Sequence, residues 1–269
     1  MADVTDLDEL VVRVLAPNPS PATLDGTNSY LLGVPGSGEV VCVDPGPALP
    51  AHRAALERAA EARDAEIVAV VLTHHHRDHS EAATWAEGWG VPLHAADPAL
   101  IDVPARRLAD GAALDFAGCR IEAVATPGHA SDHLCLRVGE TGAVLTGDHI
   151  LGRGTTVVAW PDGDMAAYLG SLERLRSIDA PVLYPGHGPA VTRPREVVDG
   201  YIAHRGERER QILRALQEGR DSPAGIVELV YADVAAHLHP LAQRSVRAHL
   251  AKLVDEGRVR EEHGRFQPA

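Results

Sequence analysis

The chain has 269 residues, of which 45% are hydrophobic and 23% are charged, and its formal net charge is -13 at pH 7. This composition is typical of a folded globular protein and excludes a disordered or fibrous chain. The acidic balance argues against a protein that binds polyanions over its whole surface, although it leaves a local basic patch open. The length is sufficient for one large domain with a smaller one attached.

The first ten residues and the cysteines indicate a compartment. Four acidic side chains and no basic one lie within residues 1–10, which argues against a signal or transit peptide. Cys42, Cys119 and Cys135 each lie in an apolar stretch, so we expect buried thiols rather than disulfides. No run approaches the roughly 20 apolar residues of a membrane span. We therefore expect a cytoplasmic protein with no membrane partner.

Residues 1–195 alternate apolar, β-branched runs with Ala-rich helical stretches. The runs at 11–17, 28–34, 39–46 and 66–74 predict strands, and 50–63 predicts a helix. A Pro-Gly-Ser-Gly sequence at 35–38 predicts a hairpin turn. Later strands are expected within 120–129, 133–140, 143–150 and 181–188. The pattern is that of an α/β fold, in which loops at strand ends carry the reactive side chains.

The character of the chain changes after residue 195, and we predict a separate domain over 196–269. A helix over 196–217 is followed by shorter helices and a hairpin turned at Gly264, which describes a winged-helix-like module. Basic residues on the last helix and hairpin could contact nucleic acid. Acidic residues of the same module nearly cancel them, so a cover for the site or a homodimer surface stays open.

The clearest functional signal is the segment 74–79, directly after a predicted strand. Four His and one Asp fall within these six residues. Clustered imidazoles repel one another when protonated and waste core space when neutral, so they need a cation to coordinate. His74 and His76 can point to one ion while Asp78 and His79 turn to a second. A solvated polar loop is the alternative. Imidazole with carboxylate favours zinc, with iron or manganese as alternatives.

Three further motifs place a His or Asp after a predicted strand. They are Thr-Pro-Gly-His ending at His129, Thr-Gly-Asp-His containing Asp148, and Tyr-Pro-Gly-His ending at His187. Pro-Gly before His makes a tight turn that fixes the backbone and directs the side chain outward. Each motif is weak alone. Together with the first segment and in this order, they predict a site for two divalent metal ions.

This order of motifs resembles the metallo-β-lactamase superfamily over roughly residues 10–192. The resemblance implies a four-layer αβ/βα sandwich with the metals at one edge of two packed sheets. It also implies that Asp148 bridges the two ions, and that Asp78 orients the nucleophile as well as binding metal. A water shared by two cations loses its proton near neutral pH and becomes a hydroxide, so the implied reaction is hydrolysis. The implied ligand sets are His74, His76 and His129 for the first ion and Asp78, His79 and His187 for the second.

Departures within the superfamily narrow the chemistry. Asp148 stands where many true β-lactamases carry Cys or Ser, which argues against antibiotic hydrolysis. His76 stands where diiron oxygen reductases carry Glu, which argues against redox chemistry. Gly-His-Gly-Pro at 186–189 differs from the Gly-His-Glu-Tyr typical of glyoxalase II. The flanks of the motifs, and Tyr-Ile-Ala-His-Arg at 201–205, resemble the beta-lactamase-like protein 2 family, whose animal member is an endoribonuclease acting on single-stranded RNA.

The resemblance implies a phosphodiester substrate of the single-stranded RNA kind. A thioesterase or ester hydrolase of glyoxalase II type, acting on a small acyl substrate, is the first alternative. Aromatic residues are only 4% of the chain, which leaves few stacking platforms for bases and favours the small molecule. A DNA-binding regulator that senses a metal or ligand is the second alternative, although a full ligand set argues against it.

Four residues are candidates for supporting the site. Asp44 ends a strand before Pro-Gly and would either orient a ligand or cap the turn. His133 would be a hydrogen-bond partner or proton donor, or would fill a polar strand edge. Arg153 and Thr155, in the loop after the Gly-Asp-His motif, would bind an anionic substrate group. A plain surface position is the alternative for Arg153.

Overall fold

The computed structural model describes residues 3–269, which form two compact units. The first unit consists of the chain up to Thr126, Asp132–Thr155 and Asp179–Pro194. The second consists of Pro127–Ser131, Thr156–Ile178 and Arg195–Ala269. The domain boundary expected between residues 195 and 196 stays a prediction. Within residues 3–269, none of the helices combines the length and the apolar character that crossing a bilayer requires.

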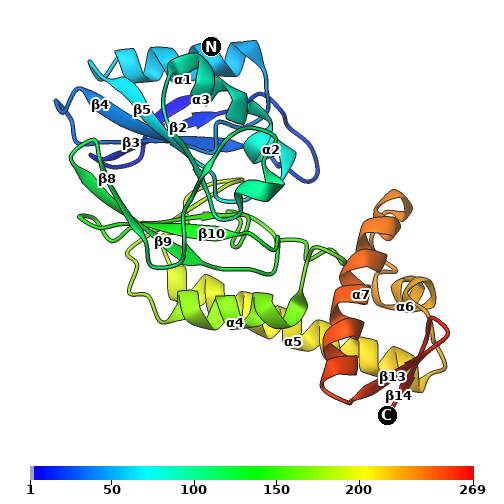
Figure 1. Cartoon of the computed structure of the whole chain (residues 1–269). Coiled ribbons are helices and arrows are strands. Elements are labelled where there is room, and N and C mark those ends of the chain that lie inside the picture. Colours follow the sequence, from blue (N-terminus) through cyan, green and yellow to red (C-terminus); the bar gives the residue numbers. More distant parts are fainter. Residues whose placement is uncertain (1–2) are drawn as a thin grey trace. The chain divides into compact units, whose positions relative to one another are not determined.

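The first unit contains a seven-stranded sheet in sequential order, with the four N-terminal strands antiparallel and the rest parallel. The predicted hairpin at 35–38 joins its third and fourth strands. Figure 1 shows α1 and α3 on one face of this sheet. The strands are β1 (Val4–Asp6), β2 (Val11–Leu15), β3 (Asn28–Leu32), β4 (Glu39–Val43), β5 (Glu66–Val71), β6 (Leu93–Ala95) and β7 (Arg106–Arg107), and the helical segments are α1 (Pro50–Glu61), α2 (Arg77–Ser80), η1 (Glu81–Thr84), α3 (Trp85–Trp89) and η2 (Pro98–Leu100).

The central strands of this sheet are apolar without a break because both faces are covered. Val41 and Val43 of β4 pack into the core shared with the second sheet. Val40 and Cys42, which point the other way, pack against α1 and α3. Successive side chains of a strand point to opposite faces, so alternation divides one apolar run between two cores.

A five-stranded sheet completes the first unit and packs face to face with the first sheet. Ile121 and Leu136 contribute to the shared core, whereas Arg137 and Glu122 form an ion pair on the other face. Neighbouring strands are antiparallel except for the last pair, β11 and β12, which is parallel. The strands are β8 (Ala113–Phe116), β9 (Cys119–Ala125), β10 (Leu134–Val138), β11 (Val144–Gly147) and β12 (Leu183–Pro185).

The second unit is mainly helical and ends in a hairpin. Asp164 caps α4 by accepting a hydrogen bond from the Ala167 backbone N–H, and Ser222 caps α6 in the same way through Gly225. Ile212, Val246 and Phe266 lie in its apolar core. Its elements are α4 (Met165–Arg176), α5 (Pro194–Gln217), α6 (Pro223–Val230), η3 (Ala236–Leu238), α7 (His239–Asp255), β13 (Val259–Glu262) and β14 (Arg265–Pro268).

Candidate metal centre

The predicted ligands all follow the ends of strands. His74 follows β5, Asp148 follows β11 and His187 follows β12. Because β11 and β12 run parallel, their carboxyl ends meet at one edge of their sheet. Asp78 and His79 lie in α2, one short turn after His74, so a single stretch of backbone supplies side chains in two directions.

Four ligand atoms converge in the first unit. His79 Nε2 lies 3.3 Å from His187 Nε2 and 3.4 Å from Asp148 Oδ1. Asp78 Oδ2 lies 3.1 Å from His187 Nε2 and 3.7 Å from His79 Nε2. Ligands that surround zinc tetrahedrally at about 2.0–2.1 Å are themselves about 3.4 Å apart. The spacing of these four atoms therefore fits a tetrahedral cation, and their chemistry is that of a zinc, iron or manganese site.

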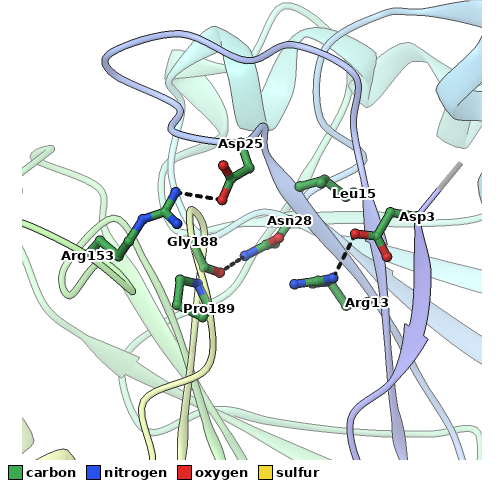
Figure 2. Close-up of a pocket in the computed structure, with 8 residues that line it drawn as sticks. All are labelled: Asp3, Arg13, Leu15, Asp25, Asn28, Arg153, Gly188 and Pro189. Carbon is green, nitrogen blue, oxygen red and sulfur yellow. Dashed lines mark hydrogen bonds and ion pairs between the residues drawn. The ribbon is translucent and has the colours of Figure 1, made fainter.

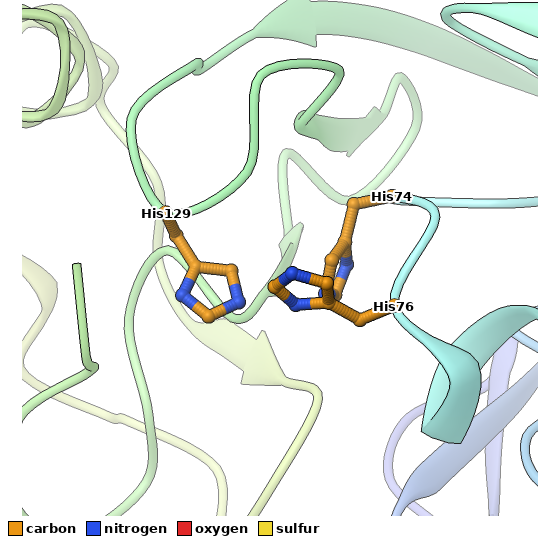
Figure 3. A group of neighbouring side chains, drawn as sticks. All are labelled: His74, His76 and His129. Atoms are coloured by element: carbon orange, nitrogen blue, oxygen red, sulfur yellow. The ribbon is translucent and has the colours of Figure 1, made fainter. Parts of the chain in front are cut away.

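A second convergence involves three histidines. Each of His74, His76 and His129 offers one ring nitrogen, and these atoms lie within 4.8 Å of one another. Figure 3 shows these three side chains. His74 also lies with His79 and Asp148, so the division of the seven predicted ligands between two ions stays a prediction. We call His74, His76 and His129 the first group, and Asp78, His79 and His187 the second group, with Asp148 beside the second.

Asp44 supports ligands of both groups. Its carboxylate is 2% exposed and accepts three hydrogen bonds, from the Thr73 backbone N–H at 2.7 Å, from Thr73 Oγ1 at 2.7 Å and from His79 Nδ1 at 2.8 Å. Since a carboxylate can only accept here, His79 carries its proton on Nδ1 and leaves Nε2 for a cation. Thr73 Oγ1, having donated to Asp44, accepts from His74 Nδ1 at 3.0 Å. These contacts fit a residue that orients the ligands, rather than one that caps the turn after β4.

His187 is held by backbone. Its Nδ1 donates to the Gly26 carbonyl at 3.1 Å, and a bridge joins Thr27 to His187. The residue before it must be glycine, because an added Cβ on Gly186 would lie 2.6 Å from the His79 ring. The Pro-Gly turn therefore brings the end of β12 against its neighbours as well as aiming His187.

His133 supports Asp148 through the backbone. The Asp148 N–H donates to His133 Nε2 at 3.1 Å, so His133 carries its proton on Nδ1, which lies 2.9 Å from Thr126 Oγ1. His133 is 1% exposed. Its contacts are those of a hydrogen-bond partner that fixes the position of a ligand, as one of the two interpretations from sequence has it.

The electrostatics of the second group favour a cation. Burial opposes ionisation of Asp78, but His79 and His187 outweigh it and lower the pKa of Asp78 to about 2. Burial likewise opposes protonation of His187, yet Asp148 and Asp78 raise its pKa to about 9. The pKa of His79 is raised well above its usual value, against burial, by the same carboxylates and Asp44. Ionised carboxylates that hold protons on neighbouring imidazoles also attract a metal ion in their place.

The loop after Asp148 contains Arg153 and Thr155, the residues predicted to bind an anionic group of the substrate. Arg153 is exposed and pairs with Asp25 at 2.6 Å, beside a cavity of about 170 Å³ in the first unit (Figure 2). Thr155 is half-buried, and it is the next residue, Thr156, whose hydroxyl lies 3.3 Å from His129 Nδ1. Substrate binding by Arg153 and Thr155 stays a prediction.

Two further residues, not predicted from the sequence, support the site. Thr73 links Asp44 to His74, and its position directly before the His segment was the available signal. Asp132 is 7% exposed and accepts a hydrogen bond from His75 Nδ1 at 2.7 Å. Its place in Ser-Asp-His, next to His133, is an ordinary sequence that gives no sign of this contact.

Comparison with known proteins decides the family. A family model described as the metallo-beta-lactamase superfamily matches residues 22–116 and 81–187, and one described as the beta-lactamase associated winged helix domain matches residues 222–266. The chain is a member of the metallo-beta-lactamase superfamily. It is a hydrolase of that superfamily, and the fold class predicted from the sequence, including the winged-helix-like C-terminal part, is confirmed.

Relatives and solved structures extend over almost the whole chain. A beta-lactamase-like protein 2 homolog of Caenorhabditis elegans is 33% identical and aligns over 97% of this chain and 89% of its own length. An atrochrysone carboxyl ACP thioesterase of Aspergillus chevalieri is 35% identical over 89% of this chain and 76% of its own. The crystal structure of a beta-lactamase domain protein from Burkholderia ambifaria has a TM-score of 0.87 at 26% identity, covering 99% of this chain and 94% of that one. The resemblance to the beta-lactamase-like protein 2 family is thereby confirmed.

Proposed function

We propose that this protein is a metal-dependent hydrolase of acyl thioesters or related small esters. It would bind two divalent cations per chain, and zinc is the preferred candidate. The observation that carries the metal-dependent mechanism is the convergence of four ligand atoms at tetrahedral spacing. His74, His76 and His129 would hold one ion, and Asp78, His79 and His187 the other, with Asp148 as a further ligand. Two bound cations would supply a water of lowered pKa and a Lewis acid for the scissile carbonyl.

The chain's own residues have separate tasks in this proposal. Asp78 is the most exposed ligand of the second group, with its side chain 31% exposed against 0% and 1% for His79 and His187. Its Oδ2 faces the histidines, so we assign its Oδ1 to accept a hydrogen bond from the attacking water. Asp44 and His133 keep the ligands oriented while charge develops, which preorganises the site.

A small acyl substrate is favoured over RNA by the pairing of basic residues in the C-terminal part. Lys252 of α7 and Arg258, the residue before β13, both pair with Glu209, and Arg247 pairs with Glu261. Basic side chains that are neutralised by carboxylates attract the phosphates of a nucleic acid only weakly. Two relatives, at 35% and 36% identity, carry the name thioesterase. Hydrolysis of a phosphodiester remains the second candidate, supported by the likeness to the beta-lactamase-like protein 2 homologs.

The test begins with metal content, measured by elemental mass spectrometry on protein purified without a His tag. Turnover would then be compared on an acyl thioester, bis(p-nitrophenyl) phosphate and a single-stranded RNA oligonucleotide. We expect about two metal ions per chain, thioester turnover, and loss of that turnover in Asp78→Ala but not in Asp102→Ala, an exposed carboxylate of the same unit. RNA cleavage alone would select the second candidate, and a chain that binds no metal after reconstitution would overturn both.

A further inference from the structure

Arg205 of α5 is a buried arginine with no carboxylate at its guanidinium among residues 3–269. Its relative exposure is 3%, and Nη2 donates to the backbone carbonyl of Thr156. The guanidinium also lies over the ring of Tyr168 in α4, 5.3 Å from the ring centroid. Burying a charged guanidinium costs free energy. We therefore expect a role of Arg205 in what the bound loop does, beyond its contribution to packing.

The loop that Arg205 holds is in direct contact with His129. The carbonyl of Val157, the next residue after Thr156, accepts a hydrogen bond from His129 Nδ1 at 2.7 Å. The hydroxyl of Thr156 lies 3.3 Å from the same nitrogen. This hydrogen bond fixes the ring's tautomer and rotation and leaves Nε2 as the nitrogen that can face a cation.

The second contact of Arg205 reaches the same segment from the other side. Tyr168 packs so closely on Gly128, the residue before His129, that an added Cβ there would lie 2.3 Å from Tyr168 Cα. The Asp164 N–H, at the start of α4, donates to the Gly128 carbonyl at 2.9 Å. The ring of His129 is therefore held by the Thr156–Val157 loop and the residue before it packs on Tyr168, which are the two partners of Arg205, and all of these residues belong to the second unit.

We propose that Arg205 is a positioning residue for the first group: it ties the Thr156–Val157 loop and Tyr168 together and so holds His129 for metal binding. This inference rests on the proposed function, because it requires a cation at the first group. The second group has different supports, Asp44 and the Gly26 carbonyl, so it serves as an internal control.

Arg208 provides the matched control on the same helix. It lies over the Tyr231 ring at 4.1 Å from the centroid and donates to the Val230 carbonyl, so it makes the same two kinds of contact as Arg205. These partners belong to α6 and the residue after it, rather than to the Thr156–Val157 loop. Loss of Arg208 should cost stability without touching His129.

The experiment titrates the metal-free parent, Arg205→Met and Arg208→Met with Zn²⁺ alone against a chromophoric chelator. In Arg205→Met we expect one of two zinc affinities to fall by about 10- to 100-fold, the usual effect of removing a group that orients a ligand, while the other is unchanged. Arg208→Met should keep both affinities. Adding Arg205→Met to His129→Ala should cause no further loss, because both changes act on one ligand.

Three results would overturn the inference: unchanged affinities in Arg205→Met, an equal loss at both ions, or the same loss in Arg208→Met. A parent protein that binds no zinc would instead contradict the proposed function. If Arg205→Met does not fold, Arg205→Lys and Arg208→Lys carry the same comparison. Lysine retains a cationic donor but not the planar guanidinium, so a smaller loss confined to one ion is expected.

Discussion

The two ligand groups differ in what holds their rings. In the second group His79 donates to the buried carboxylate of Asp44, whereas in the first His74 donates to a hydroxyl and His129 to a backbone carbonyl. A carboxylate makes the imidazole behind it more basic than a neutral acceptor does. We therefore expect the second group to bind its ion more tightly than the first, and the affinity of the first group to depend on the geometry of the loop that holds His129.

The largest expected effect comes from Gly128→Ala, which breaks the support of the first group. Gly128 has a φ of 135°, and a Cβ would lie 2.4 Å from the Tyr168 backbone nitrogen. We expect unfolding free energy to fall by about 3 kcal/mol or more, since both strain and backbone overlap must be relieved. Gly170→Ala in α4, where a Cβ meets nothing within 4 Å, is the control and should be neutral or stabilising. Urea denaturation of both variants gives the comparison, and equal stabilities would contradict it.

The stability of the metal-free protein should depend on pH through the second group. The pKa of His187 is raised to about 9, so its proton stabilises the fold fully below about pH 6.5 and is lost as pH rises through 9. We expect loss of this one proton to cost the chelator-treated protein about 1.4 kcal/mol per pH unit over this window, and His79, whose pKa is also raised, to steepen the slope. With zinc bound the slope should vanish, because the ion replaces the proton. Denaturation curves from pH 6 to 10, with and without zinc, would show a common slope if this is wrong.

Asp44→Asn tests whether the carboxylate sets the affinity of the second group. The amide keeps the size of the side chain but removes the charge that His79 Nδ1 faces. We expect the tighter zinc affinity to fall by about 10- to 100-fold, with a smaller loss at the other ion through Thr73. Chelator competition measures both constants, with Asp102→Asn as the control. A greater loss at the weaker ion would reverse the assignment of supports.

Thr73→Val should give the smallest effect, mainly at the first group. Valine matches the shape of threonine but removes the hydroxyl, which donates to Asp44 Oδ2 and accepts from His74 Nδ1. The expected cost is a severalfold weaker first ion, about 1 kcal/mol for the neutral hydrogen bond to His74, and a smaller loss at the second ion, because Asp44 keeps its hydrogen bonds from the Thr73 backbone and His79. The same zinc titration measures it. A loss larger than that of Asp44→Asn would contradict the ranking of carboxylate over hydroxyl.

Much of the fold could be predicted because its strands are visible in the sequence as apolar runs. Strands such as β4 and β5 are buried on both faces and read as unbroken apolar runs, and α5 was expected over 196–217 and begins at Pro194. The two units could not be predicted. Pro127–Ser131 and Thr156–Ile178 cluster with the C-terminal residues through contacts such as Arg205 to Thr156, which no local pattern records.

The seven predicted ligands come together because their residue types have few other uses in such a pattern. Supporting residues are harder to predict, since Thr73 and Asp132 are ordinary residues until their partners are placed. Arg205 lies within the Tyr-Ile-Ala-His-Arg segment that contributed to the resemblance, yet nothing in that segment indicates a contact with the loop beside His129. Its role depends on the packing of α5 with α4 and a loop almost 50 residues away.

The bridge between Thr27 and His187 has a consequence for the order in which the protein matures. His187 is the last of the predicted ligands to be synthesised, and its backbone pairs with that of Thr27, 160 residues earlier. A nascent chain that ends before His187 therefore cannot complete the second group. Closing so long a loop is slow and entropically expensive. Zinc capture should therefore be a late event in biosynthesis, one that fastens the two ends of the first unit after its sheets have formed.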